Sequence, residues 1–230
     1  MLLLGIDSSA KTASCGIVKD DKTIVDITLD NNKTHSEKLL EMIDMSLKLT
    51  NHNISDIDAF CVCKGPGSFT GLRIGLTTIK GLCHALNKPC YMCSTLDALY
   101  ENVKNDYNED FLIVPVMDAR RNEVYTACFL NGEKIVDDTA IKITDLFDVI
   151  SKIKFDKILF TGDGVSPNKE LIENEYKGRV YFSKGNDSYA RGTAVIKASI
   201  KNESVCYNNI LPNYLRKSQA ERVKTDKKQV

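Results

Sequence analysis

One pattern occurs twice in the sequence, and its second occurrence begins close to the middle of the 230 residues. Residues 2–19 read LLLGIDSSAKTASCGIVK, and residues 111–130 read FLIVPVMDARRNEVYTACFL. In each, an apolar run ends at an aspartate (Asp7 or Asp118), a polar turn follows, and a second apolar run carries a cysteine. Two apolar runs joined by a short polar turn are typical of a β-hairpin. A hairpin that opens each half of the chain predicts two lobes of related architecture.

Strands and helices are expected to alternate after each hairpin. Thr34, followed three residues later by Glu37, is a capping box, and it predicts a helix that runs to about Thr50. The polar stretch 104–110 is the expected boundary, which gives a first lobe over 1–103, a second and smaller lobe over 104–215, and a basic tail over 216–230. The mixture predicts an α/β protein with mixed sheets. The other expected elements are strands at 22–29, 57–63, 89–92 and 157–161 and helices at 72–86, 96–103, 144–153, after Pro167, and 188–201.

The charge balance bears on nucleic-acid binding. Lysine and arginine total 31, and aspartate and glutamate also total 31. Phosphate binding depends on clustered basic residues, so this balance argues against a protein that holds nucleic acid without partners. The start, MLLLGID, is too short for a signal peptide or a membrane span, and we expect a cytoplasmic protein without membrane contact.

The eight cysteines are then expected to be reduced thiols. Cys61 and Cys63 alternate along an apolar run, and Cys90 and Cys93 form a single CxxC pair. A structural zinc site usually takes two such pairs. We favour small buried apolar residues over a metal or redox site.

A glycine-rich loop joins the strand 57–63 to the helix 72–86. It reads GPGSFTGLRIG from Gly65, and its spacing matches neither a Walker loop nor a Rossmann fingerprint. A loop that enters a helix N-terminus holds an anion in many proteins, and a tight turn packed against another helix explains the glycines equally well. The candidate nucleotide or anion contacts are this loop and the first hairpin turn: Gly65, Gly67, Gly71, Asp7, Ser8, Ser9 and Thr12. For the hairpin turn, ordinary turn chemistry is the favoured explanation of the Asp and Ser residues.

Each of the two first-lobe helices carries a second apolar or small-residue stripe. A surface helix of a lone domain needs only one apolar stripe. The second stripes favour a surface for a partner helix over one covered by the protein's own second lobe. On the first helix, the expected core residues are Leu39, Leu40, Ile43 and Leu47, and the second stripe is Met42, Met45 and Leu49. On the second helix, the second stripe is Ile74, Thr78, Gly81 and Ala85.

Catalytic arrangements are scarce in the sequence. The three histidines, His35, His52 and His84, include no pair four residues apart, and no GxSxG motif occurs. The residues therefore give no catalytic or metal-binding candidate.

Six segments in a fixed order resemble the TsaB (YeaZ) family. They span Gly5 to Glu221 and read GIDSS, THSEKLL, GPGSFTGLRIG, MDARRNEVY, GDG and LPNYLRKSQAE. The resemblance implies the actin/Hsp70/sugar-kinase (ASKHA) fold and a part in bacterial tRNA threonylcarbamoyladenosine synthesis. It implies a non-catalytic scaffold that pairs with the transferase TsaD and with itself, and that works with the ATPase TsaE. It places the interface on the two first-lobe helices.

The resemblance also implies limits on chemistry. The catalytic paralogue carries a His-x-x-x-His pair in the stretch that matches residues 93–103, and this stretch contains no histidine here. No tightly bound cofactor is expected, ATP or ADP is expected at a complex interface, and tRNA is expected only through the complex. The alternatives are an independent enzyme of the same fold, either a metal-dependent glycoprotease or a small-molecule kinase, and a nucleotide-binding regulator.

Overall fold

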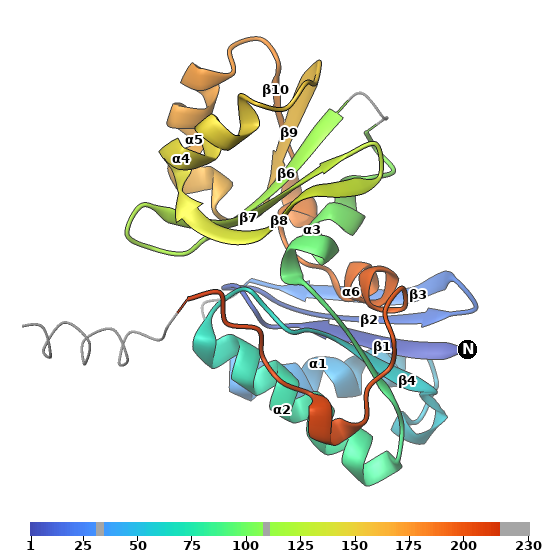
Figure 1. Cartoon of the computed structure of the whole chain (residues 1–230). Coiled ribbons are helices and arrows are strands. Elements are labelled where there is room, and N and C mark those ends of the chain that lie inside the picture. Colours follow the sequence, from blue (N-terminus) through green and yellow to red (C-terminus); the bar gives the residue numbers. More distant parts are fainter. Residues whose placement is uncertain (31–34, 108–110, 217–230) are drawn as a thin grey trace, which may run out of the picture.

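The computed structural model describes residues 1–30, 35–107 and 111–216. Two five-stranded mixed sheets lie one above the other (Figure 1). The first has the strand order β3-β2-β1-β4-β5, in which β1 to β3 are antiparallel and β4 and β5 run parallel to β1. Its strands are β1 (Leu2–Asp7), β2 (Ala13–Lys19), β3 (Lys22–Leu29), β4 (Ala59–Cys63) and β5 (Cys90–Cys93).

The second sheet repeats this connectivity. Its order is β10-β9-β6-β7-β8, with an antiparallel β6–β7–β8 meander and with β9 and β10 parallel to β6. Its strands are β6 (Phe111–Asp118), β7 (Glu123–Leu130), β8 (Glu133–Lys142), β9 (Lys157–Thr161) and β10 (Val180–Phe182). The two predicted hairpins thus open two sheets of the same topology, and the expectation of two related lobes is confirmed.

Helices form three layers around the two sheets. The helices α1 (His35–Leu49) and α2 (Phe69–Leu86) cover the outer face of the first sheet, and α4 (Ile143–Ile150) and α5 (Val165–Glu175) cover the second (Figure 1). Between the sheets lie α3 (Thr95–Val103) and α6 (Gly192–Ser199). Short 3₁₀ turns are η1 (Ile54–Asp56), η2 (Gly185–Ser188) and η3 (Tyr207–Asn209).

Alternation along the strands divides the core. Leu4 and Ile6 of β1 pack with α1 and α2, whereas Leu3 packs in the middle layer with α6. The same alternation directs Cys61 and Cys63 into the middle layer, where both are buried. The expectation that these two cysteines are small buried residues is confirmed.

Helix α2 begins one turn earlier than predicted. The side chain of Ser68 accepts a hydrogen bond from the backbone N–H of Gly71, at 3.3 Å, and so caps the helix before Phe69. The predicted capping box at Thr34 lies outside the described residues, although α1 itself ends at Leu49 as expected.

The chain returns to the first sheet after the second one is complete. Gly192 at the start of α6 lies directly against the backbone of Gly16, where a Cβ atom has no room. Further on, Val205 forms a bridge with Cys90 at the edge of β5, and Ile210 is buried beside α2. Residues 190–216 therefore pack mainly against the first sheet, although the sequence assigned most of them to the second lobe. Of the predicted tail, only Arg216 is described.

Candidate functional site

The first hairpin turn and the glycine loop meet directly. The carbonyl oxygen of Ser9 accepts a hydrogen bond from the backbone N–H of Ser68, at 2.7 Å. The hydroxyl of Ser8 donates to the carbonyl oxygen of Gly71, at 2.9 Å. A Cβ atom at Gly67 would lie 2.5 Å from the Ser9 carbonyl oxygen, so glycine is needed for this approach. The two groups of predicted contact residues are thus adjacent, and part of their polarity is used in holding each other.

The carboxylate of Asp7 organises the turn. It accepts hydrogen bonds from the backbone N–H of Ser9, at 3.2 Å, and from its hydroxyl, at 3.0 Å. This is an Asx turn, in agreement with the favoured explanation of these residues. Ser8 and Thr12 are each only 2% exposed. Their side chains therefore belong to the packed interior of the lobe.

The second lobe presents a matching arrangement across the cleft. The carboxylate of Asp163, in the loop after β9, accepts a hydrogen bond from the backbone N–H of Asp118, at 3.2 Å. The carboxylate of Asp118 accepts one from the N–H of Arg120, at 2.7 Å. Burial raises the pKa of Asp163, and the nearby charge of Asp118 adds to this effect.

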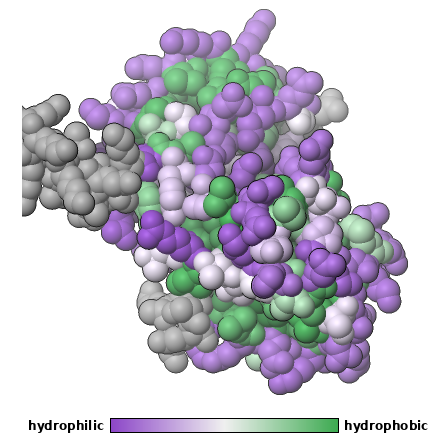
Figure 2. Space-filling model, turned by 60° about the horizontal axis from the view of Figure 1, so that its bottom comes forward, coloured by the Kyte–Doolittle hydropathy of each residue, from purple (hydrophilic) through white to green (hydrophobic). Residues whose placement is uncertain are grey.

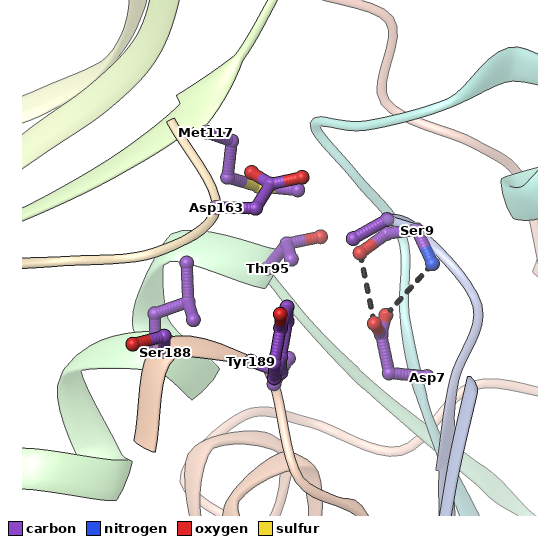
Figure 3. A pocket seen from close by; sticks show the side chains of 10 residues that line it. Asp7, Ser9, Thr95, Met117, Asp163, Ser188 and Tyr189 are labelled. Atoms are coloured by element: carbon purple, nitrogen blue, oxygen red, sulfur yellow. Dashed lines mark hydrogen bonds between the residues drawn. The ribbon is translucent and has the colours of Figure 1, made fainter. Parts of the chain in front are cut away.

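A small pocket separates the two turns (Figure 3). Its free space is about 10 Å³, close to what one water molecule needs. The hydroxyl of Thr95 is buried and has no hydrogen-bond partner among the residues that the structure describes. A space of this size does not admit a nucleotide. The lining residues are Asp7, Ser9, Ala10, Thr95, Leu99, Met117, Asp163, Ser188, Tyr189 and Ala190.

The assignment of Met42 to the outer stripe of α1 is wrong. Its side chain is 5% exposed and packs in the core beneath the first sheet, whereas Leu40, expected in the core, is 58% exposed. The buried face is rotated relative to the prediction, and it includes Ser46, which is fully buried. The hydroxyl of Ser46 donates to the carbonyl oxygen of Met42, at 2.8 Å, so a polar residue occupies a core position that a search for apolar residues overlooks.

Two residues predicted for the outer stripe of α1 do lie at the surface. Met45 is 55% exposed and Leu49 is 66% exposed. On α2, Gly81 and Ala85 are exposed, and Ile74 and Thr78 are half-buried. A Cβ atom at Gly81 would meet nothing within 4 Å. Figure 2 shows hydrophobic patches among hydrophilic residues on this side of the molecule.

The described residues offer neither a metal site nor a membrane-spanning helix. Within residues 1–30, 35–107 and 111–216, no group of three or more His, Cys, Asp or Glu side chains is arranged to hold a metal ion. Burial raises the pKa values of the Cys61 and Cys63 thiols. None of the described helices combines the length and the apolar character needed to cross a bilayer.

Duplicated βββαβαβ lobes that enclose a cleft define the class of this protein, the ASKHA fold. The hexokinase of the ROK family from Thermus thermophilus shares the fold, with a TM-score of 0.52 and 11% identity over 87% of this chain and 99% of that one. A structure described as YeaZ from Pseudomonas aeruginosa matches with a TM-score of 0.75 and 21% identity, over 93% of this chain and 99% of that one.

Sequence comparison identifies the family. The family model described as "TsaD: tRNA N6-adenosine threonylcarbamoyltransferase" matches residues 29–224. The "tRNA threonylcarbamoyladenosine biosynthesis protein TsaB" of Bacillus subtilis (strain 168) is 30% identical over 225 residues, which is 96% of each chain. The protein of the same name from Buchnera aphidicola is 29% identical over 71% of this chain and 79% of its own. The chain belongs to the TsaB (YeaZ) family.

Proposed function

We propose that this protein is a non-catalytic subunit of the machinery that makes threonylcarbamoyladenosine in tRNA. In this proposal, the outer faces of α1 and α2 bind and order a TsaD-type transferase, and a TsaE-type ATPase joins the complex. The same surface serves self-association when the partner is absent. The names of the family members support the pathway, and we infer a cytoplasmic location from that role.

The exposed apolar side chains of α1 carry the proposal. Leu40, Met45 and Leu49 are each more than half exposed on this one helix. Burying a large aliphatic side chain fully contributes about 1.5–3 kcal/mol, and Met45 and Leu49 are 55% and 66% exposed, so a partner that covers both gains roughly 2–3 kcal/mol from them. The second lobe lies on the opposite side of the first sheet (Figure 1). It therefore does not cover this surface, and a second molecule is the better occupant.

The α2 edge beside this surface favours a helix as the contacting element. Gly81 and Ala85 are small and exposed, which allows a neighbouring helix to approach closely. Viewed down the axis of α1, the charged residues Glu41, Asp44 and Lys48 fall between Leu40 and Met45 on the exposed side of the helix. A mixed surface of this kind is typical of subunits that also exist apart from their partners.

The interlobe pocket supports a role without catalysis in this chain. A space of about 10 Å³ does not admit a nucleotide or a peptide, so the independent kinase and glycoprotease alternatives find no room for a substrate in this pocket. Threonylcarbamoyl transfer, and any contact of ATP or ADP, then falls to the complex, and tRNA is reached through the transferase.

Reconstitution tests the proposal. Purified TsaD-type and TsaE-type partners from the same organism are assayed for tRNA threonylcarbamoylation with and without this chain, and binding is measured by calorimetry. We expect transfer to depend on this chain, and Leu49→Asp to weaken binding about 100-fold, because a charge replaces a buried apolar contact. The control is Leu171→Asp on α5, where Leu171 is 50% exposed on the other lobe. Equal binding by both variants, or transfer that is indifferent to this chain, contradicts the proposal.

A further inference from the structure

Residues 211–216 form a segment, called here the C-terminal strap, that crosses from one lobe to the other. Its first attachment is to the glycine loop before α2. The backbone N–H of Asn213 donates to the carbonyl oxygen of Lys64, at 2.6 Å. A Cβ atom at Gly65 would lie 2.5 Å from the Asn213 carbonyl oxygen, so a larger residue at position 65 would displace the strap.

An aromatic contact fixes the middle of the strap to the start of α2. The rings of Tyr214 and Phe69 stack with centroids 4.4 Å apart and planes 18° apart. The Nε of Arg73 donates to the hydroxyl of Tyr214, at 3.0 Å, and its guanidinium lies near the same ring. These contacts attach the strap to the first lobe independently of its end.

Arg216 then reaches the second lobe. Its Nη1 donates to the carbonyl oxygen of Ala119, at 2.7 Å, and its Nη2 forms an ion pair with the carboxylate of Glu123. Ala119 directly follows β6 and Glu123 is the first residue of β7, so the two acceptors flank the β6–β7 turn. The Arg216 side chain is only 11% exposed, so this pair is more protected from solvent than an ordinary surface ion pair.

The two attachment sites of the strap lie on opposite sides of the interlobe pocket. The glycine loop contacts Ser9, and the β6–β7 turn follows Met117; Ser9 and Met117 both line the pocket. The closed pocket contains the unpartnered hydroxyl of Thr95 and the desolvated carboxyl of Asp163. Burial of such groups costs free energy, so closure depends on favourable contacts outside the pocket.

We propose that the C-terminal strap is a clasp that holds the two lobes closed over this pocket, and that release of Arg216 opens the pocket to solvent. The helices α3 and α6 pack between the sheets and remain in place, so the lobes turn about them and do not separate. This inference does not depend on the proposed partner.

Hydrogen exchange followed by mass spectrometry on the full-length protein tests the clasp. We expect Arg216→Ala to speed exchange about tenfold in peptides that cover residues 7–12, 93–99 and 186–190, with unchanged exchange in α4 and β9. Arg216→Lys keeps the charge but loses the two-pronged contact, so an intermediate rate is expected. The control is Arg179→Ala, because Arg179 contacts Phe155 within the second lobe only.

Two results would overturn the clasp. Exchange at the pocket that is the same in Arg216→Ala and in the unmodified protein shows that the lobes stay closed without it. A uniform increase across both sheets, together with a lower unfolding temperature, shows that Arg216 merely stabilises the fold. An increase confined to the pocket, with Arg179→Ala unchanged, supports the clasp.

Discussion

The two lobes share one strand order but differ in the helices that cover them. The outer helices of the first lobe, α1 and α2, have 15 and 18 residues, whereas α4 and α5 of the second have 8 and 11. Helix α4 buries Ile143, Leu146 and Ile150 against its sheet. Helix α1 buries a comparable face and also exposes three large apolar side chains. The extra length therefore occurs together with three exposed large apolar side chains on α1, whereas on α5 Leu171 is exposed.

The glycine loops, by contrast, behave alike in both lobes. Gly67 approaches the backbone of Ser9 in the first hairpin turn, and Gly164, between β9 and α5, approaches the backbone of Met117 and Asp118 at the end of β6. A feature that both lobes share belongs to the duplicated fold. What differs between the halves, the outer surface of α1 and α2, is the better place to look for a function particular to this protein.

The largest expected effect separates the inner from the outer face of α1. Met42→Asp places a carboxylate in the core and should lower the free energy of unfolding by about 3 kcal/mol or more. Met45→Asp, three residues on and 55% exposed, should change it by no more than about 0.5 kcal/mol. Urea unfolding of both variants measures the difference. Equal losses would contradict the burial of Met42 and restore it to the outer stripe.

A smaller effect is expected at the loop of the second lobe. Burial raises the pKa of Asp163 in the folded protein, so the folded state holds this proton more tightly than the unfolded chain does. The favourable contribution of the protonated Asp163 carboxyl to the free energy of unfolding is fully present below the unfolded pKa of about 3.9. It is lost as pH rises through the folded pKa. Asp163→Asn can still accept the Asp118 hydrogen bond, and it should stabilise the protein at pH 7 but not at pH 3.

The check is the free energy of unfolding of Asp163→Asn and of the unmodified protein across that pH range. The matched control is Asp145→Asn, since Asp145 is an exposed residue on α4. Stabilisation by Asp163→Asn that is equal at pH 3 and pH 7 would show that the carboxyl is not desolvated in the closed cleft.

The sequence predicts the strands and hairpins of this molecule better than it predicts which helix faces are exposed. Hairpin turns depend on local residues such as Asp7, so they can be inferred from neighbours in the chain, whereas the start of α2, which Ser68 caps, was placed one turn too late. The buried face of α1 includes Ser46, whose hydroxyl is hydrogen-bonded within the helix, and the spacing of apolar residues does not identify such a position. The meeting of Ser8 with Gly71 was expected only as a shared ligand contact, and the structure instead pairs the two directly.

The C-terminal strap could not be predicted for a different reason. Arg216 pairs with Glu123, and Tyr214 stacks on Phe69, across sequence separations that no local pattern encodes. The segment was assigned to the second lobe and its tail because it follows that lobe in the chain. Its attachment to the first lobe comes from packing, which appears only when the two sheets are placed together.

The smallest expected effect sharpens the comparison between stability and association. Gly81 lies in the interior of α2, and a Cβ atom there meets nothing within 4 Å. Gly81→Ala should therefore raise the free energy of unfolding of the isolated protein by about 0.5–1 kcal/mol, as expected for a better helix former at an open site.

If a partner helix packs closely on this edge, the added methyl group should weaken association while it stabilises the free chain. Ala85→Gly, one turn further on, should destabilise the chain by a similar amount and leave close approach unhindered. Unfolding measurements and partner titrations on both variants separate the two contributions, and association that strengthens with Gly81→Ala would place the partner elsewhere on the molecule.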